Sequence, residues 1–211
     1  MWRYRGYSAI DTARNQMATD AIAAGFAEMM WIDSDIAFDP DDVARLRGHN
    51  LPIACGLYPK KGPRQFACEF LPGTPAVQFG RGGGLLEIRY CGFGFTLVRR
   101  EVFQILHRQL NLPIANRRFP SPLIPFFEPM VVPDPGGAWS LQEDYAFCER
   151  ARRCGVRVVA DTAIRLWHVG SYRYGWEDAG REPERYADYT FLFPGNDSPS
   201  DGRGLPDTAI P

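Results

Sequence analysis

The chain has 211 residues and a formal net charge of −1, from 24 Lys and Arg residues against 25 Asp and Glu residues. This length suits one domain with a substantial apolar core. The basic residues are scattered and form no stripe that would neutralise nucleic-acid phosphates, so no nucleic-acid partner is expected. No apolar run approaches the roughly 18 to 20 residues that a membrane-spanning helix needs.

The cysteines and the N-terminal residues bear on the cellular compartment of the protein. The five cysteines are odd in number, include no Cys-x-x-Cys pair and lie mostly in apolar runs, where a free thiol packs as a small hydrophobe. Residues 1–5 lack the hydrophobic core of a signal peptide. We therefore expect a cytoplasmic protein with no transmembrane segment, and peripheral membrane contact stays open.

The first predicted helix runs from Ser8 to Gly25. Ser8 and Asp11 suit its first turn, and Gly25 suits its C-terminal stop. The apolar run at 29–32 then predicts a buried parallel strand. The apolar positions of the helix, which recur at helical spacing and are expected to form one face, are Ile10, Ala13, Met17, Ala21 and Ala24.

The alternation of helix and strand continues up to Tyr58. Asp39-Pro40 is an N-cap followed by proline, which predicts a second helix ending at Gly48. Residues 51–58 predict another apolar strand. Short segments separated by Gly and Pro follow, including 65–71 and 85–98, and they predict antiparallel or mixed strands.

The second half of the chain predicts a helix over 101–110 and a long loop over 112–137. Seven prolines in that loop predict that it forms no regular element, and its length is typical of a functional or disordered segment. Residues 142–154 predict a helix closed by Gly155, and 156–160 predict a terminal strand of the sheet.

One catalytic domain is expected over residues 1–194. The composition of residues 195–211, rich in Gly, Pro, Ser and Asp, is typical of a flexible tail. The chain contains no internal repeats.

The motif Asp33-Ser34-Asp35 comes directly after the apolar run at 29–32. Two carboxylates at a strand end point oxygen ligands into the crevice where open α/β sheets bind ligands, and such oxygens suit Mg²⁺ or Mn²⁺. With 15 Asp residues, about one Asp-x-Asp is expected by chance, and Asp39-Pro40-Asp41 is a second instance that reads as a helix cap. A solvated turn is the alternative for Asp33 and Asp35, but their position after the strand favours a metal site.

Two further candidates lie late in the chain. Glu143-Asp144 opens a helix, where the helix dipole alone would favour carboxylates. A group-transfer enzyme, however, needs a base to deprotonate an acceptor hydroxyl, and Asp144 is the better candidate, with Glu143 its neighbour. His168 follows the last predicted strand; a lone histidine is more often structural, yet histidine is the commonest nitrogen ligand of metals.

These residues, taken in order, resemble the landmarks of GT-A glycosyltransferases of the family 2-like group. The resemblance covers about residues 8–170 and implies an α/β fold, a Rossmann-like mixed sheet flanked by helices. The matched segments are Arg14-Asn15, Met30 to Asp35, Cys91 to Arg100, Glu143 to Cys148, and Trp167 to Gly170.

The resemblance also implies roles for individual residues. Mn²⁺ or Mg²⁺ would be bound by Asp35 and His168, and Asp33 would contact the ribose or a metal-bound water. Asp144 would be the base if the enzyme inverts. Arg14 would lie near the nucleotide, and the Gly92-Phe93-Gly94 turn would let the backbone approach the donor sugar.

Four other side chains are weaker candidates. Lys60, Lys61 and Arg64 follow a strand end and could steady phosphate charge, although a solvated loop explains them equally well. Trp139 could stack on an acceptor sugar, with ordinary loop packing as the alternative.

One departure from the family pattern concerns the N-terminus. GT-A domains usually begin with a strand that helps to bind the nucleotide base, whereas only seven residues, Met1 to Tyr7, precede the first predicted helix. We therefore expect the fold to lack its usual first strand. A late chain start, a different mode of base recognition, or a degenerate inactive copy would each explain this.

The leading hypothesis is a metal-dependent glycosyltransferase that moves a sugar from a UDP- or GDP-sugar to a saccharide or other hydroxyl acceptor. One alternative is a nucleotide- or sugar-binding domain without turnover. Another is a haloacid dehalogenase-type phosphatase, but Ala37 stands where that motif expects Thr or Val. The donor sugar, the base and the stereochemical outcome stay open.

Overall fold

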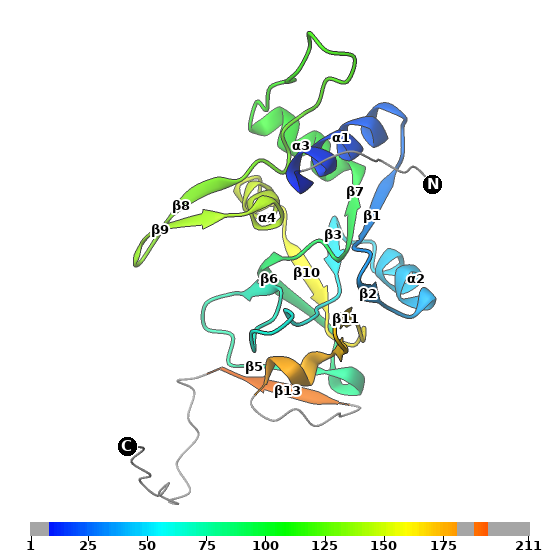
Figure 1. Ribbon diagram of the computed structural model, residues 1–211, viewed down its shortest axis with the longest axis vertical. Helices are drawn as coiled ribbons and strands as arrows, with labels where there is room; N and C mark the ends of the chain where they lie inside the picture. The colour runs from blue at the N-terminus through cyan, green and yellow to red at the C-terminus, as the bar shows by residue number, and fades with distance from the viewer. Residues whose placement is uncertain (1–8, 181–187, 194–211) are drawn as a thin grey trace, which may run out of the picture.

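The computed structural model describes residues 9–180 and 188–193, which form a mixed α/β structure (Figure 1). A six-stranded mixed sheet is flanked by helices, with α3 in contact with both α1 and α4. The helices are α1 (Ile10–Ala23), α2 (Pro40–Gly48), α3 (Arg100–Gln109) and α4 (Glu143–Arg153). In spatial order the strands are β1 (Glu28–Ile32), β7 (Phe95–Arg99), β3 (Ile53–Cys55), β10 (Val158–Asp161), β6 (Leu85–Cys91) and β4 (Cys68–Phe70).

Three smaller sheets and two 3₁₀ helices complete the described part of the chain. The first sheet joins β12 (Arg173–Tyr174), β11 (Trp167–Val169) and β2 (Ile36–Ala37). The others pair β13 (Tyr189–Leu192) with β5 (Ala76–Phe79), and β8 (Met130–Asp134) with β9 (Gly137–Leu141). The 3₁₀ helices are η1 (Gly80–Gly82) and η2 (Trp176–Ala179).

Strand directions bring distant segments to one edge of the main sheet. Strand β7 runs antiparallel to both β1 and β3, and β3 runs parallel to β10. Strands β1, β3 and β10 therefore share one direction and end at the same edge. The residues that follow them, beginning with Asp33, Gly56 and Thr162, lie along this edge, where open α/β sheets bind ligands.

The sheet is covered on both faces by apolar side chains, in two clusters. Ile53 and Cys55 of β3 face the larger cluster, whereas Ala54 between them faces the smaller one with Leu46 of α2. This is the alternation expected of a strand buried on both faces. All five cysteines are free thiols and four are buried, which confirms that they pack as small hydrophobes.

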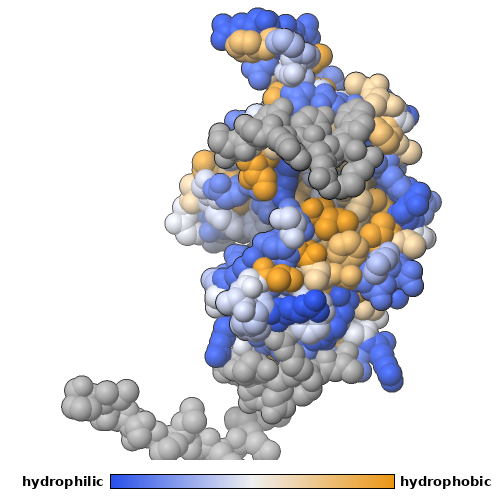
Figure 2. All heavy atoms as spheres, turned by 45° about the vertical axis from the view of Figure 1, so that its right-hand side comes forward, coloured by the Kyte–Doolittle hydropathy of each residue, from blue (hydrophilic) through white to orange (hydrophobic). Residues whose placement is uncertain are grey.

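Strand β1 was expected to be a buried parallel strand, and this prediction was wrong. It forms one edge of the sheet and pairs antiparallel with β7. Figure 2 turns this side of the molecule forward and shows apolar side chains gathered among hydrophilic ones. Phe26 and Ile32, just before β1 and at its end, are both exposed. The apolar run identified a strand, but it carried no information on its neighbours.

Helix α1 has a buried face that matches the predicted one only in part, since Ala21 is buried and Met17 packs against the core as expected. Ile10, expected in the apolar face, is 52% exposed, whereas Arg14, Asn15 and Gln16 are buried. The polar side chains find partners inside: Asn15 Oδ1, for example, accepts a hydrogen bond from the Phe127 N–H at 2.7 Å. These polar side chains share the buried face of the helix with Ala18 and Ala21.

Two predictions in the second half of the chain were also wrong. Residues 112–137 do contain a regular element, since β8 lies there and forms a hairpin with β9. Pro133 is tolerated because this ladder has only two strands. The strand predicted at 156–160 is not terminal: β10 lies inside the sheet between β3 and β6, and all four of its residues are buried.

Other predictions were confirmed or lie outside the described residues. Helix α2 begins at Pro40, and the Asp39 side chain accepts a hydrogen bond from the Asp41 N–H. Gly25 follows α1 with φ of +79°, as a helix stop requires. Among the described residues, no helix is both long and apolar enough to cross a membrane. The predicted tail, Ser8 and the seven residues before it lie outside the described part.

Candidate active site

The backbone around Asp33 and Asp35 is anchored on both sides. The Asp33 N–H donates to the Gly94 carbonyl at 3.0 Å, and the Asp35 carbonyl accepts from the Val169 N–H at 2.7 Å. The side chains of Asp33 and Asp35 are 40% and 41% exposed. The two carboxylates are thus held at the sheet edge and remain open to solvent and to a ligand.

His168 and Lys61 converge on Asp35. Asp35 Oδ2 lies 3.4 Å from His168 Nε2 and 2.6 Å from Lys61 Nζ. On the other side of the ring, His168 Nδ1 lies 2.9 Å from the Pro59 carbonyl oxygen. Because a carbonyl only accepts, Nδ1 carries the hydrogen, and in the neutral ring Nε2 keeps its lone pair on the Asp35 side. A carbonyl behind a histidine in this way is typical of metal-binding histidines.

The charge of Asp35 is balanced by its neighbours. The hydrogen bond from Lys61 holds the pKa of Asp35 below its ordinary value, although partial burial acts in the opposite direction. Asp35 is therefore an ionised carboxylate with an ammonium group beside it.

Arg14 joins the two acidic pairs that the sequence placed more than a hundred residues apart. Its guanidinium donates to Asp33 Oδ1 at 3.2 Å and to Glu143 Oε1 at 2.9 Å, and it lies 5.5 Å from the centroid of the Phe93 ring. Only 5% of Arg14 is exposed. The predicted residues Arg14, Asp33 and Glu143 thus form one network, with Arg14 buried and the Asp33 side chain 40% exposed.

Asp144 has the strongest perturbation among the carboxylates of this region. Burial raises its pKa to about 6, and the neighbouring charge of Glu143 adds to the increase. Asp144 Oδ1 also accepts a hydrogen bond from the Tyr145 N–H at 2.7 Å, which opposes the increase. A carboxylate that titrates near neutral pH is suited to exchange a proton with a ligand.

The glycines of the Gly92-Phe93-Gly94 turn make room for Tyr58. A Cβ atom on either glycine would lie 2.5 Å from Tyr58 Oη, and the Gly94 N–H donates to this oxygen at 3.0 Å. The Phe93 side chain is buried in the core. The family resemblance implies that this turn approaches a donor sugar. In the structure, the two glycines leave the space that the Tyr58 hydroxyl occupies.

Tyr58 is a positioning residue that the sequence analysis missed. Its ring packs edge-on against His168, with the ring centroids 5.3 Å apart, while its hydroxyl holds Gly94, whose carbonyl in turn binds Asp33. Burial raises the pKa of Tyr58, which keeps the hydroxyl neutral. Its place at the end of the predicted strand 51–58 was the only indication in the sequence.

Tyr58→Phe is expected to lower the free energy of unfolding by about 1 to 3 kcal/mol, because the buried Gly94 N–H loses its acceptor. Urea unfolding would measure the change. Tyr174→Phe is the control, since the Tyr174 hydroxyl lies 3.4 Å from Ser171 Oγ at an exposed position. Equal losses in the two variants would contradict this role of Tyr58.

Two predicted residues contact side chains other than the candidate site carboxylates. Lys60 Nζ is 3.4 Å from Gln65 Oε1, so Lys61, and not Lys60, approaches Asp35. Trp139 in β9 packs beside Tyr90 and Tyr145, with ring centroids 5.7 and 6.0 Å away.

Within the described ranges, no group of three or more His, Cys, Asp or Glu side chains is placed to hold a metal ion. Of the predicted ligands, Asp35 and His168 come together, whereas Asp33 turns to Arg14.

Comparison with known proteins does not indicate a function for this chain. No protein-family model matches the sequence, and no curated protein matches it. Among solved structures, A197 from STIV is similar, with 18% sequence identity and a TM-score of 0.46, over 94% of this chain and 82% of that one. Functional inference therefore depends on the residues of this chain.

Proposed function

We propose that this chain is a metal-dependent glycosyltransferase with a GT-A fold, which transfers a sugar from a nucleoside-diphosphate sugar to an acceptor hydroxyl. The observation that carries the proposal is the pairing of Asp35 with His168, 3.4 Å apart at the sheet edge where three strands end. Asp144, with its raised pKa, supplies a candidate base.

Asp35 Oδ2 and His168 Nε2 would hold the metal. One carboxylate oxygen and one imidazole nitrogen suit Mn²⁺ better than Mg²⁺, which prefers oxygen ligands alone. Two protein ligands leave coordination positions for diphosphate oxygens. When bound, the metal would stabilise the negative charge that develops on the departing diphosphate.

Lys61 occupies the place beside Asp35 that a cation would take. Its side chain is 35% exposed, and ion pairs at such positions contribute only about 0 to 1 kcal/mol. Displacing the ammonium group therefore costs little, and once displaced it can remain near the diphosphate charge.

Asp144 suits the role of base better than Glu143 does. The Glu143 carboxylate is already engaged by the Arg14 guanidinium, whereas the pKa of Asp144 is raised to about 6. Asp144 is thus mostly ionised at pH 7, yet basic enough to accept a proton from a hydroxyl as the sugar is transferred.

Isothermal titration calorimetry with Mn²⁺ and UDP or GDP tests the metal site. We expect nucleotide binding that depends on Mn²⁺ and weakens at least tenfold in Asp35→Asn. The matched control is Asp41→Asn, which changes the second Asp-x-Asp motif, at the exposed start of α2. Lys61→Gln should tighten the binding of Mn²⁺ alone severalfold, because the competing ammonium is gone. Wild-type protein that binds neither nucleotide with Mn²⁺ would contradict the proposal.

Turnover is a separate question from binding. Transferases pass sugar slowly to water, so hydrolysis of UDP- or GDP-sugars in the presence of Mn²⁺ would distinguish an enzyme from a binding domain. Release of phosphate from an aryl phosphate would instead indicate a phosphatase.

A further inference from the structure

An aromatic cluster lies beside the start of α4. It consists of Tyr90 of β6, Trp139 of β9 and Tyr145 of α4, whose ring centroids are 5.2 to 6.0 Å apart. Figure 1 shows the β8–β9 hairpin next to α4, and β9 leads almost directly into that helix. Tyr145 follows Asp144, the candidate base, in the sequence. The cluster is therefore close to the carboxylate that would accept a proton from a hydroxyl.

Trp139 supplies the accessible ring of this cluster. Tyr90 is fully buried, and its hydroxyl donates to Glu149 Oε2 at 3.0 Å, whereas Trp139 is partly exposed. The planes of Tyr90 and Tyr145 make angles of 59° and 85° with the indole, so neither ring is stacked on it. A partly exposed indole of this kind can pack against the flat, apolar face of a sugar ring.

Arg89 is held against the same cluster. Its guanidinium carbon lies 5.0 Å from the Tyr90 ring centroid and 5.7 Å from that of Trp139. A guanidinium that rests on two rings is positioned in advance, so it loses little entropy when its planar N–H donors bind the oxygens of a ligand.

Glu69 and the Tyr145 hydroxyl add two further polar groups. Glu69 lies opposite Tyr90 in the β4–β6 ladder, where facing side chains are neighbours. Burial raises the pKa of Tyr145, and the carboxylates of Asp144 and Glu69 add to the increase, so the neutral hydroxyl lies near both. Within the part of the chain that the structure describes, neither the Glu69 carboxylate nor the Tyr145 hydroxyl forms a hydrogen bond. Both remain available to a ligand.

The charges around the cluster balance. Burial raises the pKa of Glu69, the nearby Arg89 and Lys60 act against this increase, and Asp134 adds to it. Two cationic and two anionic side chains thus lie around the cluster, and they favour neither an acidic nor a basic ligand. A neutral molecule that carries many hydroxyl groups on an apolar ring fits this combination of donors, acceptors and aromatic surface.

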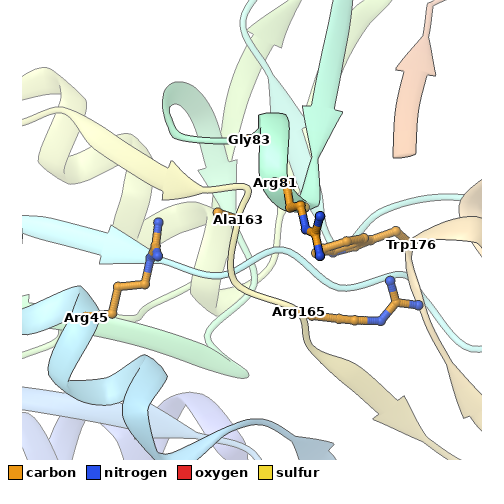
Figure 3. Close-up of a pocket in the computed structure, with 7 residues that line it drawn as sticks. Arg45, Arg81, Gly83, Ala163, Arg165 and Trp176 are labelled. Carbon is orange, nitrogen blue, oxygen red and sulfur yellow. The ribbon is translucent and has the colours of Figure 1, made fainter. Parts of the chain in front are cut away.

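The cavity shown in Figure 3 does not contain a comparable set of groups. It has a volume of about 400 Å³ and lies between α2, η1, η2 and the segment between β10 and β11. Its Arg45 and Arg165 lie on opposite sides of the segment 163–165, and each is paired with a carboxylate, Asp161 or Glu177. The polar groups of this cavity therefore do not converge on one ligand.

We propose that the aromatic cluster, with Arg89 and Glu69, binds a neutral saccharide, and that this saccharide is the acceptor of the transfer. Its ring packs on Trp139, its hydroxyl groups bond to Arg89, Glu69 and Tyr145, and the hydroxyl that reacts lies toward Asp144. Binding of the saccharide does not depend on the proposed transferase activity, whereas its role as acceptor rests on that activity.

The transfer itself follows from this placement. The acceptor oxygen forms a bond to the anomeric carbon of the donor sugar while the bond from that carbon to the diphosphate breaks, and the electron pair of the broken bond leaves with the diphosphate. The proton of the acceptor hydroxyl passes to the Asp144 carboxylate.

Saturation-transfer NMR without metal or nucleotide tests the binding, with maltose, cellobiose, lactose and diacetylchitobiose as neutral probes. We expect saturable binding of at least one of them, weakened at least tenfold in Trp139→Ala and severalfold in Tyr145→Phe, which keeps the ring and removes only the hydroxyl. Phe119→Ala, at a side chain that is 51% exposed, and Tyr174→Phe are the matched controls and should bind like wild type.

Donor turnover tests the role as acceptor. The saccharide that binds best should raise the turnover of a UDP- or GDP-sugar with Mn²⁺ above the rate of hydrolysis, and Trp139→Ala should need at least tenfold more saccharide for the same increase. The inference would be overturned if none of the four probes binds, if Trp139→Ala and Tyr145→Phe both bind like wild type, or if the bound saccharide leaves turnover unchanged. Wild-type protein that binds a saccharide but no nucleotide would contradict the proposed function, and with it the acceptor role, while the saccharide site would stand.

Discussion

Arg14→Met is expected to lower the free energy of unfolding by about 3 to 5 kcal/mol, the range for breaking a buried ion pair. Arg14 is 5% exposed and is the shared partner of Asp33 and Glu143. Methionine fills a similar volume but leaves two carboxylates facing each other without the charge between them. Urea unfolding at pH 7 and moderate salt would measure the loss.

A surface ion pair provides the control for this variant. Arg153 pairs with Glu149 at 2.9 Å on α4, and its side chain is 47% exposed, so Arg153→Met should cost no more than about 0.5 kcal/mol. Adding Asp33→Asn and Glu143→Gln to Arg14→Met should recover part of the loss, because no unpaired charge then remains. A loss no larger than that of Arg153→Met would show that Arg14 is not a structural hub.

Asp144→Asn is expected to stabilise the fold at pH 8 while it abolishes transfer. The pKa of Asp144 is raised from the ordinary 3.8 to about 6, so the folded state binds the proton more tightly than the unfolded state does. Stability is therefore greatest below about pH 4 and falls as the pH rises through 6. Two pKa units correspond to about 3 kcal/mol, and partial exposure reduces this to about 1 to 2 kcal/mol.

The test of Asp144 compares the unfolding of wild type and Asp144→Asn at two pH values and measures donor turnover. Unfolding of wild type and Asp144→Asn should differ at pH 8 and coincide near pH 4, and Asp134→Asn in the β8–β9 hairpin serves as a control. Donor turnover by the wild type should fall as the pH drops below about 6, where the base becomes protonated. If Asp144→Asn kept wild-type turnover, another group would have to act as base.

The local elements of the site were predictable because their causes are local. The apolar run before Asp33 and the cap at Asp39 depend on neighbours within a few residues. The partners of the site residues depend on tertiary contacts, and these were not predictable. Lys60 and Lys61 are adjacent in sequence, yet only Lys61 reaches Asp35, since Lys60 is turned by the bridge that joins Pro59 and Phe66.

The same limit applies to the orientation of α1 and to the glycine turn. Apolar periodicity placed Ile10 and Met17 on one face, but Ile10 is exposed, and Arg14 is buried because it finds partners inside. The glycines at 92 and 94 were expected to let the backbone approach a donor sugar, and the group that lies against them in the structure is the Tyr58 hydroxyl. Which group approaches, the Tyr58 hydroxyl, follows from the packing of β3 beside β7 and not from the turn itself.

The contacts that close the candidate active site have a consequence for folding. Arg14 and Glu143 are 129 residues apart in the chain, and Pro59 and His168 are 109 apart. Contacts of such long sequence separation form only after the entropy of closing large loops has been overcome. We therefore expect the site to assemble late, and a nascent chain that does not yet include α4 would carry Arg14 and Asp33 without Glu143, the second acidic partner of Arg14.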